Sequence, residues 1–158
     1  MSSSYAEEGT VRILGIDYGS RRIGVAICDE LGMTAQGAAT INRKNREADL
    51  DAIADLVRRY DIERIIIGYP FRLDGSEGIQ CAKINRFCRR LEARLSLPVI
   101  RRDETLSTKE AEEILRRTGT RPKKRKGIVD RVAASIILQG YLDALSRGEK
   151  VESTNRNK

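Results

Sequence analysis

The sequence predicts an α/β fold in which a five-stranded mixed sheet carries helices on both faces. Two apolar, β-branched runs, 11–17 and 22–28, are separated only by the turn residues YGSR, a pattern typical of an antiparallel hairpin. A later run, 64–68, is apolar on both of its faces, as the central strand of a parallel sheet must be. A hairpin followed by strands that alternate with helices predicts a mixed sheet covered on both sides.

The elements between the hairpin and the central run follow from turn residues and helical spacing. A third antiparallel strand is predicted over 34–41, after the turn DELGM. The next stretch, 46–60, has the apolar spacing of a helix. Its apolar positions are Leu50, Ile53, Ala54, Val57 and Tyr60.

Beyond the central run, the turn-rich segment 68–78 predicts a loop with Ser76 as a candidate helix cap. A helix over 77–95 follows, and a last strand begins at Pro98 and ends at Glu104. Residues Ile84, Phe87, Cys88, Leu91 and Leu95 share one side of that helix.

Two helices are predicted to complete the domain. Ser107 and Glu110 form a capping box, so one helix begins at Ser107. The segment 118–127 is interpreted as a basic loop, and the last helix is predicted over about 128–146. The expected packing stripe of that helix consists of Val132, Ala133, Ile136, Ile137 and Gly140. We expect a disordered leader over 1–10, one domain over 11–147 and a flexible tail over 148–158.

The charge balance points to an acidic partner. The chain has 30 Lys and Arg against 23 Asp and Glu, a net charge of +7, and nucleic acid is the commonest acidic partner. Only 4% of the residues are aromatic, so a platform on which bases stack is not expected. We expect the protein to recognise the phosphates and the shape of a nucleic acid more than its sequence. No apolar stretch approaches the ~20 residues of a membrane span, and the first ten residues lack the pattern of a secretory signal. We therefore expect a cytoplasmic protein with no membrane partner.

The absence of histidine narrows the possible chemistry. Without histidine the chain has no Ser-His or Cys-His nucleophile, no histidine general base and no histidine metal ligand. Cys28, Cys81 and Cys88 show no metal-type spacing, and reduced thiols are expected. Any catalysis must therefore use carboxylates, lysines or hydroxyls.

Three acids are candidates for a metal site. Asp17 lies at the end of the first strand, Glu104 ends the last strand and Asp130 lies in the first turn of the last predicted helix. Three carboxylates at one sheet edge can hold two Mg²⁺ or Mn²⁺ ions, the arrangement used for phosphodiester displacement. Each acid also has a structural interpretation. Asp17 can make a turn, Glu104 can be a solvated strand-end acid, and Asp130 can interact with the helix dipole.

Basic residues near these acids are candidates for substrate binding. The run RPKKRK contributes Arg121 and the four residues Lys123, Lys124, Arg125 and Lys126. Arg21 and Arg22, at the hairpin turn, are expected at the rim of the site, and Gly19 and Gly24 provide backbone room for the strand reversal. The alternative is that these charges are merely solvated.

Four motifs occur in an order that resembles a known family. They are GIDYGSRRIGVAICDE, IIIGYPFRLDGSEG, DETLST and KKRKGIVDRVAASIILQGYLD, and together they span about 11–146. This order resembles the YqgF family, also called RuvX-like, of pre-16S rRNA nucleases and Holliday junction resolvases. The resemblance implies a ribonuclease H-like fold and a bacterial cytoplasmic nuclease that matures the 5′ end of 16S rRNA.

The resemblance also implies an acidic triad. The family's acids map onto Asp17, Glu104 and Asp130, the positions that the spacing selects. The family often has arginine after the second acid, where this chain has Thr105. That change affects a phosphate contact or an internal ion pair rather than the carboxylates. Expected partners are structured RNA such as precursor 16S rRNA, or branched DNA, and a pre-ribosomal particle, with the chain acting as a monomer or homodimer.

Two other functions are compatible with these motifs. A ribonuclease H-like domain can serve as a nucleic-acid-binding module without catalysis, although all three acids are retained here. The segment GIDYGS also resembles the first phosphate loop of sugar kinases and actin-like ATPases, but a second copy of such a loop is not found in the sequence. The alternatives within the nuclease interpretation are a precursor rRNA substrate and a four-way DNA junction, which a dimer would cut symmetrically.

Overall fold

The computed structural model describes residues 11–70, 78–103, 107–117, 119 and 122–149 of the chain. The predicted order of strands and helices is confirmed. The strands are β1 (Ile13–Tyr18), β2 (Arg22–Cys28), β3 (Ala35–Asn42), β4 (Arg64–Tyr69) and β5 (Val99–Asp103). The helices are α2 (Arg46–Arg59), α3 (Ile79–Leu95), α4 (Ser107–Arg117) and α5 (Pro122–Ser146). The expected leader and most of the expected tail fall outside the described residues.

The five strands form one mixed sheet in the order β3-β2-β1-β4-β5. β1 pairs antiparallel with β2 and parallel with β4, and β4 pairs parallel with β5. The sheet therefore has its parallel half at β1, β4 and β5, and the carboxyl ends of these three strands lie at one edge. That edge is where open α/β sheets place their ligand sites.

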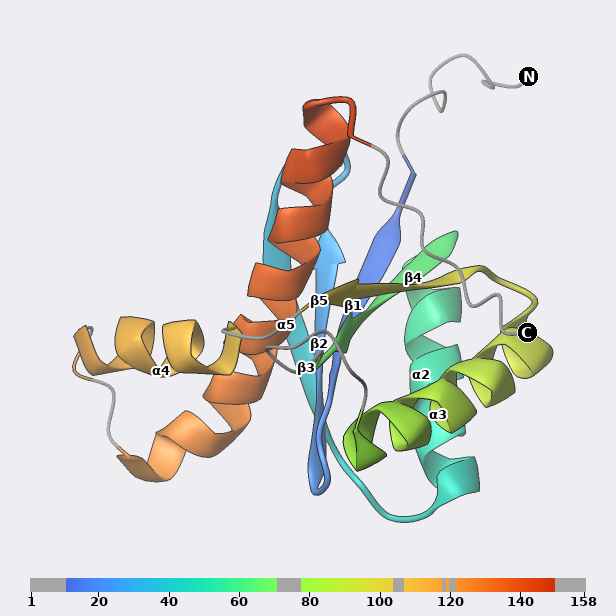
Figure 1. The fold of residues 1–158 in the computed structure, drawn as a ribbon, viewed down its shortest axis with the longest axis horizontal. Helices are drawn as coiled ribbons and strands as arrows, with labels where there is room; N and C mark the ends of the chain where they lie inside the picture. The colour runs from blue at the N-terminus through green and yellow to red at the C-terminus, as the bar shows by residue number, and fades with distance from the viewer. Residues whose placement is uncertain (1–10, 71–77, 104–106, 118, 120–121, 150–158) are drawn as a thin grey trace.

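Helices cover both faces of the sheet, with α5 on one face and α2 and α3 on the other (Figure 1). Alternation along the central strand β4 explains how both faces are filled, because Ile66 packs in the α5 core and Ile65 and Ile67 pack in the α2–α3 core. All three isoleucines are fully buried, and each buried side chain of this size stabilises the fold by about 1.5–3 kcal/mol.

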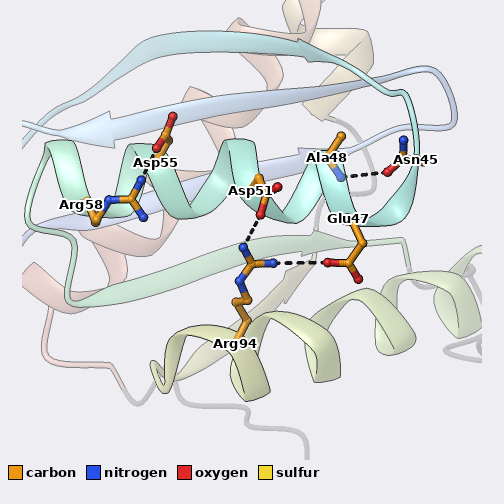
Figure 2. Close-up of polar contacts among 7 residues, drawn as sticks. All are labelled: Asn45, Glu47, Ala48, Asp51, Asp55, Arg58 and Arg94. Atoms are coloured by element: carbon orange, nitrogen blue, oxygen red, sulfur yellow. Dashed lines mark hydrogen bonds and ion pairs between the residues drawn. The ribbon is translucent and has the colours of Figure 1, made fainter.

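Ion pairs at the surface connect helices α2 and α3, in addition to the core between them (Figure 2). The Asn45 side chain accepts a hydrogen bond from the Ala48 N–H at 2.9 Å and so caps the start of α2. Arg94 of α3 reaches across to two acids of α2, Glu47 at 3.6 Å and Asp51. These exposed pairs orient the two helices and add little stability.

Two predicted features of the helices are wrong in detail. α3 begins at Ile79 with Gly78 as its cap and no side-chain cap bond, rather than at 77; Ser76 lies outside the described residues. The sheet-facing stripe of α5 is shifted from the one expected, because this helix packs against the sheet on one side and α4 on another, so apolar residues surround it. Its residues in the sheet core are Ala134, Ile137, Leu138, Tyr141 and Leu142.

The three cysteines are buried and free, as expected for reduced thiols. Cys81 and Cys88 lie seven residues apart, about two turns of α3, and pack in the same core. Burial raises the pKa of the Cys88 thiol to about 12, so this group is an inert part of the core. Among the described residues, helices of the length and hydropathy needed to cross a membrane are absent.

Candidate active site at the end of β1

Asp17 lies near the end of β1, directly opposite Gly24 of β2 in the antiparallel ladder. Paired residues of neighbouring strands project from the same face of a sheet. A Cβ atom on Gly24 would point at Asp130 of α5, so Gly24 projects from the face of the sheet that α5 covers. Asp17 therefore lies on the α5 face of the sheet and is partly buried there.

Asp130 is brought next to Asp17 by the missing side chain of Gly24. A Cβ atom at Gly24 would lie 1.9 Å from the Asp130 carbonyl oxygen and 2.9 Å from the Asp130 Cβ, so only glycine permits this approach. Gly24 thus makes room for α5, and the sequence-based assignment of Gly24 to the strand reversal is wrong. Gly19 does serve the reversal, since a Cβ there would lie 2.6 Å from the Arg22 carbonyl oxygen.

The start of α5 corrects two further expectations. The helix begins at Pro122, not near 128, so the basic run from 122 to 126 is helical backbone rather than a loop. Proline is favoured at the first position of a helix, and lysine and arginine are good helix formers, signals that outweigh the charge of the run. Asp130 then lies more than two turns into α5, where the helix dipole has no effect. An interaction with that dipole therefore does not account for this acid.

Arg22 forms an ion pair with Asp130, with 2.6 Å between Nε and Oδ2. The two side chains are 29% and 16% exposed, so the pair is partly shielded from water. Arg22 was expected at the rim of the site, and no local pattern in the sequence indicates this pairing. A positive group is therefore held against one of the two acids, while the neighbouring Arg21 is exposed at the hairpin turn.

Contacts to β3 fix the part of α5 that carries Asp130. Thr40 donates from Oγ1 to the Gly127 carbonyl at 2.7 Å and accepts from Arg131 Nη1 at 3.0 Å. A Cβ on Gly37 would lie 3.0 Å from the Arg131 Cβ, so the helix packs closely on this strand as well. These contacts flank Asp130 on both sides in sequence and restrict how far it can move from Asp17.

The remaining predicted residues lie at or beyond the limit of what the structure describes. Glu104 and Arg121 are outside the described residues. For Lys123, Lys124, Arg125 and Lys126, only the helical backbone is described. Within the described parts of the chain, clusters of three or more carboxylate or cysteine groups able to hold a metal are absent, and the site there consists of two acids and Arg22.

Comparisons with known proteins show which family this chain resembles. The family model described as "RuvX: Holliday junction resolvase" matches residues 11–144. A Syntrophus aciditrophicus protein named "Putative pre-16S rRNA nuclease" is 66% identical over 143 residues, covering 90% of this chain and 95% of that protein. A Halothermothrix orenii protein of the same name is 53% identical, covering 84% of this chain and 95% of that protein.

Solved structures show the same fold at low sequence identity. The T. thermophilus RuvC structure, in complex with a Holliday junction substrate, has a TM-score of 0.57 at 15% identity and covers 89% of this chain and 98% of that one. The structure of the yeast mitochondrial Holliday junction resolvase Ydc2 has a TM-score of 0.56 at 12% identity, and the match covers 87% of this chain and 80% of that one. The predicted ribonuclease H-like fold is confirmed. From the extent of the family match and the identity to these relatives, the chain belongs to the RuvX family.

Proposed function

We propose that this protein is a metal-dependent endonuclease that cleaves phosphodiester bonds in structured nucleic acid, with precursor 16S rRNA as its substrate. The observation that carries the proposal is the juxtaposition of Asp17 and Asp130 across Gly24, at the carboxyl end of a central strand. Relatives with 66% and 53% identity are named for pre-16S rRNA nuclease activity, which supports the choice of RNA. The proposed role in maturing the 5′ end follows from the resemblance to the YqgF family alone.

Glu104 is proposed as the third acid. It follows Asp103, the last residue of β5, in the sequence. In β5, Ile100 packs in the α5 core and Arg102 lies against Gly140 of α5, so the even-numbered positions face α5. Strand alternation therefore favours the α5 side for Glu104 too, which is the side that holds Asp17 and Asp130.

These residues fit a hard divalent cation. Asp17 of β1 and Asp130 of α5 lie on the same face of the sheet on either side of Gly24, and a positive group, Arg22, lies 2.6 Å from the Asp130 carboxylate. Oxygen donors of this kind suit Mg²⁺ or Mn²⁺, and three carboxylates are enough for two ions. When bound, such ions lower the pKa of an attacking water and stabilise the leaving oxygen. Asp17, Glu104 and Asp130 would hold them, and Arg22 would orient Asp130 and contact the phosphate beside it.

The basic residues near the acids are proposed to bind the substrate backbone. Arg21 is exposed beside the ion-paired Arg22. Lys123, Lys124, Arg125 and Lys126 occupy the two turns of α5 that precede Asp130. Carboxylates repel a polyanion, so a site built from acids needs compensating cations nearby to hold its substrate. Binding that falls steeply with salt is the expected consequence.

The second candidate function is resolution of four-way DNA junctions. The family model carries that description, and structures of the same fold include resolvases. A non-catalytic binding module is the third possibility. It would show salt-sensitive nucleic-acid binding and lack cleavage with either metal.

A side-by-side cleavage assay separates these functions. A precursor 16S rRNA fragment and a four-way DNA junction are incubated with the protein in Mg²⁺, in Mn²⁺ and in EDTA. We expect metal-dependent cleavage of the RNA, lost in Asp17→Asn and in Asp130→Asn. Asp55→Asn is the control, because Asp55 is an exposed acid on the opposite face of the sheet. Full activity in Asp17→Asn contradicts the site assignment, and cleavage of the junction alone favours the second candidate.

A further inference from the structure

A pocket of about 420 Å³ lies on the other face of the sheet, between the end of β1 and helices α2 and α3. None of its charged lining residues belongs to the acid site or to the candidate site residues named from the sequence. We call it the α2–α3 pocket. The basic residues among those that line it are Arg43, Arg46, Lys83, Arg86 and Arg90.

Positive charge dominates the α2–α3 pocket. Its acid, Asp49, is buried, accepts from Arg43 Nε at 3.2 Å and from the Lys44 N–H at 3.1 Å, and so is matched by Arg43. The other basic side chains of the pocket form no ion pair with any acid in the described parts of the chain. Four cations therefore face one cavity without a described counter-charge, an arrangement that favours an anionic ligand.

The aromatic groups of the pocket are already engaged with protein. The rings of Tyr18 and Phe87 contact each other, with 4.4 Å between their centroids. The Arg43 guanidinium lies over the Tyr18 ring at 4.5 Å. Because Tyr18 already has two such contacts and Phe87 is buried, base stacking is disfavoured here and phosphate recognition is favoured.

The cations form a line rather than a single cluster. Lys83, Arg86 and Arg90 follow the i, i+3, i+7 spacing of one helix face and all line the pocket. At 1.5 Å per residue they extend for about 10 Å along α3. Arg46, the first residue of α2, lines the pocket from the other helix. A row of this length suits several successive phosphates better than one isolated phosphate group.

The pocket and the acid site share one strand end. Consecutive residues of a strand point to opposite faces, so Asp17 faces α5 while Tyr18 packs in the α2–α3 core and lines the pocket. Gln80 of α3 donates from Nε2 to the Tyr18 carbonyl at 3.4 Å, which holds the start of α3 beside the same strand end. A nucleic acid that passes over this end can reach both faces.

We propose that the α2–α3 pocket binds backbone phosphates of the nucleic-acid substrate on one side of the bond that is cleaved. The substrate then bends around the end of β1, with the scissile phosphate on the α5 face and a flanking segment on the opposite face. This inference rests on the proposed function for the identity of the polyanion, while the pocket's charge and position come from the structure.

The test measures binding of a labelled RNA hairpin with a single-stranded extension by fluorescence anisotropy in EDTA, over a range of KCl concentrations. The variant is Lys83→Gln/Arg86→Gln, at two exposed positions of α3. Each lost phosphate contact reduces the salt slope by about 0.7–0.9, so the double variant should lose about 1.4–1.8. If the affinities converge near 1 M salt, Kd at about 0.1 M KCl rises about 25- to 60-fold.

The matched control is Arg59→Gln/Arg89→Gln, which removes the same charge from two exposed residues that do not line the pocket. We expect its slope to stay close to that of the unmodified protein. Equal slope changes in both double variants overturn the proposal, because they indicate that the net positive charge of the protein, rather than the pocket, attracts the RNA. An unchanged slope in Lys83→Gln/Arg86→Gln overturns it as well. If that variant fails to fold, Arg90→Gln measures the loss of one contact in the same way.

A calorimetric titration with ATP and with pyrophosphate tests for a small phosphate ligand instead. Binding of either one that is lost in Lys83→Gln/Arg86→Gln, while the RNA slope stays unchanged, assigns the pocket to free phosphates and overturns the nucleic-acid proposal. All RNA binding is measured without metal. Loss of cleavage in Asp17→Asn therefore bears on the proposed function alone, and the salt slope bears on the pocket alone.

Discussion

Replacing Gly24 by alanine tests whether the closeness of α5 to the sheet builds the acid site. The new Cβ would lie 1.9 Å from the Asp130 carbonyl oxygen, and an ordinary contact needs about 3.4 Å, so α5 must retreat by about 1.5 Å at Asp130. Overpacking of this kind costs about 1–3 kcal/mol. We expect the upper end, because the clash is with backbone rather than with a flexible side chain. For a chain of this size, about 3 kcal/mol lowers Tm by about 6–12 °C.

The same displacement should reduce cleavage, although no functional group is removed. Misplacing a reacting group by about 1 Å costs about 100-fold in rate, and the predicted shift of Asp130 from Asp17 is at least that large. The measurements are thermal unfolding and single-turnover cleavage at a temperature where the variant is folded.

Two other glycine variants make the result interpretable. Gly127→Ala lies in α5 one turn before Asp130, where the new Cβ would meet only ordinary contacts, the nearest at 3.7 Å. It should stabilise the helix by about 0.5–1 kcal/mol. Gly15→Ala overpacks α5 at Leu138, two turns beyond Asp130, with a Cβ contact of 2.8 Å. It should lower stability but reduce cleavage less than Gly24→Ala. A Gly24→Ala protein with unchanged Tm and full activity would refute the reasoning.

Two further predictions concern stability. The unfolded Cys88 thiol loses its proton above about pH 9 whereas the folded thiol has a pKa of about 12, because burial disfavours the thiolate. The unfolded state then binds fewer protons, so the free energy of unfolding falls between these pH values by on the order of 1 kcal/mol per pH unit. Urea titrations should show a shallower fall of this free energy with pH in Cys88→Ala. The second prediction is that Asp49→Asn costs about 1.5–3 kcal/mol of stability, because a buried carboxylate loses its charge opposite Arg43. Asp55→Asn, at an exposed pair with Arg58, should change stability by no more than about 0.5 kcal/mol. Equal Tm values for the two variants would contradict the difference in burial.

The features predicted correctly from the sequence are those that local patterns specify. The hairpin of β1 and β2, the doubly buried β4 and the helical spacing of α2 each follow from a few neighbouring residues. The predicted start of α5 is wrong because a run of like charges is typical of a loop, whereas here Pro122 and the lysines after it favour a helix.

The features that were missed depend on residues far apart in the chain. A glycine inside a strand predicts a close approach of some other group, but not which one, so the contact of Gly24 with Asp130 could not be read from the sequence. The pairing of Arg22 with Asp130 spans 108 positions and has no local signal. The α2–α3 pocket likewise collects residues from the end of β1, the start of α2 and the length of α3.

The arrangement around β1 explains how a site made of acids can serve a protein of net charge +7. Asp17 and Asp130 repel phosphates, and Arg22 offsets only part of that repulsion because it is paired with one of them. Charge interactions in water extend about 8–10 Å at physiological salt, so compensating cations must lie near the path of the substrate to matter. Strand alternation meets this requirement, since one step from Asp17 to Tyr18 crosses from the acid face to the basic pocket. On the proposals made above, substrate binding and cleavage take place on opposite faces of one strand end, and a nucleic acid able to bend around that end contacts both.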